Sequence, residues 1–142
     1  MATINASISV SSDMMGYPIN ISKTMTMMKF QSCAGLEETS GLRSKKFQSA
    51  SAVAIIEQNE YTSTLASKVY IRNTGSSKEN FFYVAKHVSA ASDTTDGEAI
   101  GRLYGGDWML IPYLADVNIT VAPSTSETMT LEYMVFAEEM QS

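Results

Sequence analysis

The sequence predicts an all-β protein, a single antiparallel β-sandwich of jelly-roll-like type. The first observation is a series of short alternating segments between residues 68 and 137, separated by polar turns instead of helical segments. Strands at such regular spacing are typical of sandwiches and small barrels. The second observation is that Ser and Thr make up more than a fifth of the 142 residues, which suits solvent-facing strand positions and turns. This length is sufficient for one buried core, so we expect one domain over residues 1–142.

The first 30 residues contain two further alternating segments. Residues 3–10 place Ile, Ala, Ile and Val on one face and Thr, Asn, Ser and Ser on the other, the period-two pattern of a strand buried on one face. Residues 11–18 contain Asp, Gly and Pro and are expected to form a turn or loop. Residues 19–30 alternate again. We expect both strands to complete the same sandwich as the rest of the chain.

The middle of the chain is patterned less clearly. Residues 32–44 contain two glycines and are expected to form a loop or one short helical turn. Residues 47–56 are compatible with a strand or a short helix, and their β-branched end and serines favour a strand. Residues 58–63 are expected to turn the chain.

Six strands are expected in the second half of the chain. They cover residues 68–73, 80–86, 99–104, 108–111, 117–121 and 129–137. The polar segment 73–77 suits a hairpin loop, residues 89–97 a surface loop, and Gly105–Gly106 a tight turn. Alternation within these strands predicts the core positions Val69, Ile71, Val117, Ile119, Val121, Leu131, Tyr133 and Val135.

Composition excludes several classes of function. Lys and Arg number 10 against 15 acidic residues, giving a net charge of −5, so we expect no binding to nucleic acid. No apolar run is long enough to cross a membrane, and the N-terminus lacks the features of a secretory signal. Cys33 is the single cysteine and cannot form an internal disulfide, which fits synthesis in a reducing cytoplasm.

No catalytic, metal or cofactor site can be assembled from the sequence. His87 is the only histidine, and no cysteine lies near it in the sequence to complete a metal site. The loop with Asp93 and Asp96 lacks the ligand spacing of an EF-hand. The adjacent pairs Glu37–Glu38 and Glu138–Glu139 would point to opposite faces of an extended chain and cannot act as a dyad. We therefore expect a protein that is not an enzyme and that requires no cofactor.

Methionine is unusually frequent, with 10 residues, and five of those after Met1 are concentrated in the N-terminal quarter. Methionine can fill a core, or it can form an adaptable apolar patch against a neighbouring subunit. The second alternative, together with the alternating first strand, predicts an assembly segment over about residues 1–30. Its candidate subunit-interface residues are Ile4, Ile8, Met14, Met15, Tyr17, Met25, Met27 and Met28.

The C-terminal half resembles small structural proteins of tailed bacteriophage virions. The resemblance is carried by KVYIRNTG (68–75), NFFYVAK (80–86), IGRLYGGDWMLIP (100–112) and the final segment 117–139, with a Leu-x-x-Gly-Asp turn and a terminal Glu132–Tyr133. It covers roughly residues 65–139, and its motifs are structural. The resemblance implies a β-sandwich that decorates a capsid or builds part of the neck or tail, as a homo-oligomer in contact with the major capsid protein or other virion proteins.

These observations predict one function and leave alternatives open. The first is a capsid decoration or cement protein, located in the virion after assembly in the host cytoplasm and binding across junctions between capsid subunits. The alternatives are a tail, neck or fibre protein, or a receptor- or carbohydrate-binding module that stacks sugars on Tyr104, Trp108 or Tyr113. Because Trp108 lies in an alternating apolar segment, the sequence favours a core position for it. For the first function, deletion of residues 1–12 should leave a folded domain that no longer binds the particle.

Overall fold

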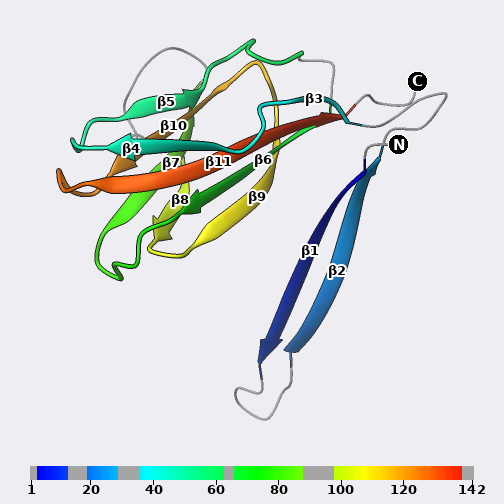
Figure 1. Ribbon diagram of the computed structural model, residues 1–142, viewed down its shortest axis with the longest axis horizontal. Helices are drawn as coiled ribbons and strands as arrows, with labels where there is room; N and C mark the ends of the chain where they lie inside the picture. The colour runs from blue at the N-terminus through cyan, green and yellow to red at the C-terminus, as the bar shows by residue number, and fades with distance from the viewer. Residues whose placement is uncertain (1–2, 13–18, 29–35, 63–65, 88–97, 139–142) are drawn as a thin grey trace.

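The computed structural model describes residues 3–12, 19–28, 36–62, 66–87 and 98–138 (Figure 1). These residues form strands, turns and loops, with no helix among them. The strands are β1 Thr3–Ser12, β2 Ile19–Met28, β3 Leu36–Thr39, β4 Arg43–Phe47, β5 Val53–Ile56, β6 Ala66–Asn73, β7 Phe81–His87, β8 Ala99–Tyr104, β9 Trp108–Tyr113, β10 Asn118–Pro123 and β11 Met129–Glu138. The six strands expected in the second half of the chain are confirmed, with ends that differ by two residues at most.

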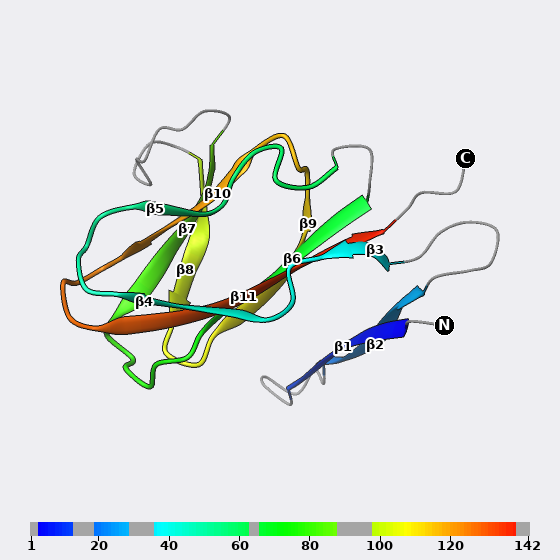
Figure 2. The ribbon, with the colours of Figure 1, turned by 45° about the horizontal axis from the view of Figure 1, so that its top comes forward.

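Two antiparallel sheets pack face to face (Figures 1 and 2). One has the strand order β5-β10-β7-β8 and the other β3-β11-β6-β9, with β4 pairing the same edge of β11 as β3. All strand pairs are antiparallel. The predicted all-β sandwich is therefore confirmed.

Period-two alternation sends one set of side chains from each sheet into the space between them. Val69 and Ile71 of β6 are fully buried, as are Val121 of β10 and Leu131 of β11. Seven of the eight predicted core residues are buried, and Val117 is half-buried against the same cluster. The rings of Phe47 and Phe82 meet edge to face across the core at 5.2 Å between centroids.

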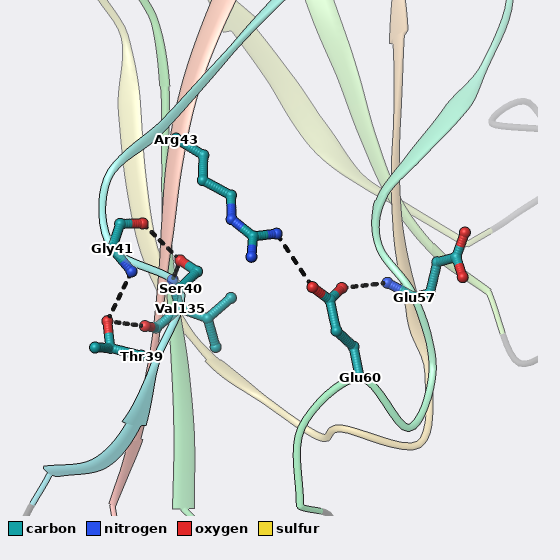
Figure 3. A network of polar contacts seen from close by, with 7 residues as sticks. All are labelled: Thr39, Ser40, Gly41, Arg43, Glu57, Glu60 and Val135. Carbon is teal, nitrogen blue, oxygen red and sulfur yellow. Dashed lines mark hydrogen bonds and ion pairs between the residues drawn. The ribbon is translucent and has the colours of Figure 1, made fainter.

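The segment 32–44 contains strand structure that its sequence does not predict. β3 pairs with the end of β11, β4 pairs with its start, and Gly41, at φ 64°, lies in the break between them. Side chains complete the hydrogen bonding of Val135 there (Figure 3): its N–H donates to Ser40 Oγ at 2.9 Å, and its carbonyl accepts from Thr39 Oγ1 at 2.9 Å as well as from the Ser40 N–H at 3.3 Å. Strands this short at a sheet edge show little apolar alternation, which explains the incorrect prediction of a loop or helical turn.

Residues 47–56 are not one continuous strand. Phe47 ends β4 in one sheet, and Val53 begins β5 in the other. The intervening residues carry the chain from sheet to sheet. The predicted β-branched strand is thus confirmed only in its second half.

The segment 73–77 is not a hairpin loop, because β6 and β7 belong to different sheets. It crosses between the layers beside the β8–β9 turn, where Asn73 is a shared anchor. Its side-chain amide donates to the Leu103 carbonyl at 3.0 Å, its carbonyl accepts from Gly106 N–H at 3.0 Å, and its N–H donates to the Asp107 carbonyl at 3.0 Å. The predicted turn at Gly105–Gly106 is confirmed, and Gly106 has φ 88°.

The N-terminal strands do not complete the sandwich. β1 and β2 pair only with each other and form a separate two-stranded sheet, hereafter the arm (residues 3–12 and 19–28). Both views show the arm projecting from the body (Figures 1 and 2). The expected strand type is correct and the expected location is wrong. The alternation that defines an apolar face does not specify which surface covers it.

Candidate functional site

The arm has one apolar and one polar face. The register pairs Val10 with Ile21 and Ser9 with Ser22, so successive pairs alternate between the two faces. On the polar face, Ser7 Oγ and Thr24 Oγ1 lie 3.0 Å apart and share a hydrogen bond. On the apolar face, the side chains remain exposed: Ile8 45%, Val10 44%, Ile19 50% and Ile21 48%. Four large aliphatic side chains on one face of the arm thus remain about half exposed among the described residues.

A cavity of about 740 Å³ lies between the arm and the sandwich. The arm contributes Ile8, Lys23 and Met25 to its lining, together with neighbouring residues of both strands. Val10, Ile19 and Ile21 are not part of that lining. The distal half of the arm's apolar face therefore lies beyond the cavity.

The sandwich contributes the outer face of β6 and β9 to the same cavity. Cross-strand pairing places Arg72 beside Trp108 in one row and Tyr70 beside Leu110 in the next, and all four line the cavity. Trp108 is 50% exposed. The prediction of a core position for this tryptophan is therefore wrong: β9 turns its other face inward, where Met109 and Ile111 pack against the core.

Glu132 of β11 links two of these residues from the next strand. Its Oε1 accepts a hydrogen bond from the Tyr70 hydroxyl at 2.9 Å and lies 3.4 Å from Arg72 Nη1. Burial, and the hydrogen bond to the Glu132 carboxylate, raise the pKa of Tyr70 above its usual value. Tyr70 is therefore a neutral hydroxyl donor at physiological pH, and Arg72 is held on the cavity wall.

The other two predicted sugar-stacking residues do not reach this surface. Tyr113 is buried and donates from its hydroxyl to the Val117 carbonyl at 2.8 Å. Tyr104 packs against Phe81, with 5.0 Å between ring centroids, on the outer face of the β5-β10-β7-β8 sheet. Arg102 lies over Phe81 on that face, 4.8 Å from the ring centroid. Only Trp108 among the three is exposed beside a cavity.

The described residues contain only part of the predicted interface. Ile8 and Met25 lie on the arm's apolar face and line the cavity. Ile4, Met27 and Met28 belong to the paired strands of the arm. Met14, Met15 and Tyr17 lie outside the described residues. The sequence missed the cavity lining of Tyr70, Arg72 and Leu110, although outward positions of β6 and β9 can be derived once their pairing register is known.

Most of the candidate residues for metal binding in the sequence lie outside the described ranges. His87 ends β7, while Cys33, Asp93 and Asp96 lie outside the described residues. Within the described ranges, no three His, Cys, Asp or Glu side chains gather closely enough to hold a metal ion. In the same ranges, no helix has the length and apolarity needed to span a membrane.

Comparison with known proteins gives one structural likeness. No model of a protein family matches the chain, and no curated protein matches it. Among solved structures, it is similar to the Yersinia pseudotuberculosis-derived mitogen (YPM), with a TM-score of 0.43 and 12% sequence identity. The likeness covers 74% of this chain and 90% of the mitogen.

Proposed function

We propose that this protein is a structural protein of a tailed-bacteriophage virion, a decoration protein that binds capsid-subunit junctions through its arm. The observation that carries the proposal is the uncovered apolar face of the arm. The resemblance of residues 65–139 to virion structural proteins supplies the setting. A sandwich from which an arm with an exposed apolar face projects suits a protein whose role is to hold neighbouring subunits together.

The arm offers two modes of attachment. Complete burial of a Val or Ile side chain contributes about 1.5–3 kcal/mol, so covering the half of each that remains exposed contributes roughly 1 kcal/mol. Four such side chains give a weak contact that symmetry multiplies over a particle. The outer edges of β1 and β2 pair with no other described strand, and an edge of this kind can accept a strand from a partner.

Paired substitutions on the two faces of the arm test this function. The test variant carries Val10→Thr and Ile21→Thr, a cross-strand pair on the apolar face. The control carries Ser9→Thr and Ser22→Thr, the adjacent pair on the polar face. Thr retains β-propensity in both variants, so only the apolar surface differs between them.

The measurement is the amount of the chain retained on purified virions of the virus that encodes it, by quantitative mass spectrometry against the major capsid protein. We expect strong loss for the apolar-face variant and wild-type occupancy for the control. Equal occupancy of both variants would refute the role of the arm. Absence of the wild-type chain from virions would refute the proposed function as a whole.

A further inference from the structure

We propose that the cavity between the arm and the β6–β9 face binds a carboxylated sugar, a hexuronate residue of an acidic glycan. This inference goes beyond assembly and does not rest on the proposed function. It rests on the aromatic, cationic and hydroxyl groups that meet in one cavity.

Trp108 provides the surface for the sugar ring. Half of its side chain is exposed, although its inward neighbours Met109 and Ile111 pack against the core. An indole ring packs its face against an apolar surface and can donate a hydrogen bond from its N–H to a polar group. The apolar face of a pyranose ring matches that surface, and Leu110 extends it into the next row.

The charge of the lining selects an acid. Lys23 enters the lining from the arm and Arg72 from the sandwich, and no carboxylate occurs among the lining residues. Glu132 of the neighbouring strand is ion-paired to Arg72 Nη1 at 3.4 Å, so Lys23, Arg72 and this carboxylate together carry a net positive charge. A local pair of cations in a chain of net charge −5 favours an anion, and a guanidinium binds a carboxylate in a two-bond geometry.

Size and polarity indicate a sugar in preference to a simple anion or a fatty acid. A cavity of about 740 Å³ is in the range of small-molecule sites and is far larger than an inorganic ion requires. Tyr70 adds a hydroxyl oxygen to its lining, and the proton of that hydroxyl is donated to Glu132. A ligand with a carboxylate, an apolar ring face and several hydroxyls uses all of these groups.

The test uses the intact isolated chain and the fluorescence of Trp108, which is the only tryptophan and therefore reports the cavity directly. The ligands are tri-galacturonate, its methyl ester, galacturonate and dodecanoate. The ester keeps the sugar shape and removes the charge. We expect a saturable change in emission with tri-galacturonate, about tenfold weaker binding of the ester, and weaker binding of the monosaccharide.

Three variants locate the site. Arg72→Gln and Lys23→Gln should each weaken tri-galacturonate binding about tenfold, while Arg43→Gln should leave it unchanged. Arg43 is a matched control because it is ion-paired to Glu60 and equally exposed, at 45% against 46% for Arg72, yet lies outside the cavity lining. Thermal melts confirm that the variants are folded.

Three results would overturn the proposal. The first is no saturable change with tri-galacturonate, and the second is tighter binding of dodecanoate than of the sugar acid. The third is a loss of tri-galacturonate binding with Arg72→Gln but not with Lys23→Gln, because the ligand would then bind the β6–β9 face without contacting the arm. Virion occupancy is measured independently, so failure of sugar binding and failure of the proposed function are distinguishable.

Discussion

The arm and the sandwich have the same sequence pattern and opposite environments. In β6, alternation buries Val69 and Ile71 completely, whereas in the arm the same alternation leaves Val10 and Ile21 nearly half exposed. The difference arises from what each strand pair faces: β6 faces a second sheet, and the arm's distal half faces no described part of its own chain. An apolar stripe therefore identifies the surface to be covered and leaves the covering partner undetermined.

The largest loss of stability is expected from truncating a side chain in the core of the sandwich. Leu131→Ala should lower the free energy of unfolding by about 2–5 kcal/mol, because Leu131 is fully buried and a cavity would remain. Leu114→Ala is the matched control: the same atoms are removed at a site that is 57% exposed. Urea unfolding measures both. Equal effects of the two substitutions would contradict the assignment of the core.

The next effect concerns the anchor between the two sheets. Asn73→Ala removes the amide donor to the Leu103 carbonyl and the acceptor of the Gly75 N–H, both at 3.0 Å. Since Asn73 is 1% exposed, we expect a loss of about 1–3 kcal/mol in unfolding free energy. Asn80→Ala is the control, because its amide donates to Glu127 in an exposed position. If the two variants melt alike, Asn73 is not the anchor of the sandwich.

Burial of Tyr113 in the core should make the stability of the protein depend on pH in the alkaline range. Burial, with lesser contributions from Glu60, Tyr61 and Asp116, raises the pKa of Tyr113 from 10.0 to about 12. The folded state then holds the phenolic proton more tightly than the unfolded state. Stability from this group is therefore complete below about pH 10 and lost as pH rises towards 12.

The size of this alkaline loss is roughly 1–3 kcal/mol. Unfolding measured at pH 9 and above in the wild type and in Tyr113→Phe tests it, because the variant lacks the titrating group and should show a shallower decline. Identical pH slopes would show that the Tyr113 phenol is accessible to water in the folded state.

The sequence predicts the fold more completely than it predicts the site. The alternating segments of the second half gave β6 to β11 because two buried sheets impose the same period on each strand. The short strands β3 and β4 were missed because edge residues such as Arg43 and Lys46 face solvent. Trp108 was misassigned because alternation in β9 separates two faces without stating which one is inward. The site depends on the register between β6 and β9 and on the position of the arm, and neither follows from local pattern.

The smallest change in stability is expected from a substitution on the exposed apolar face of the arm. Val10→Thr in the isolated chain should change the free energy of unfolding by less than about 0.5 kcal/mol, because the side chain is already 44% exposed and the arm contributes no strand to either large sheet. Urea unfolding at two protein concentrations measures it, with Val121→Thr as the buried counterpart, at 0% exposure in β10. A loss above about 1 kcal/mol for Val10→Thr would mean that the arm is already covered in the isolated protein. Dependence of that loss on protein concentration would identify the cover as a second copy of the chain.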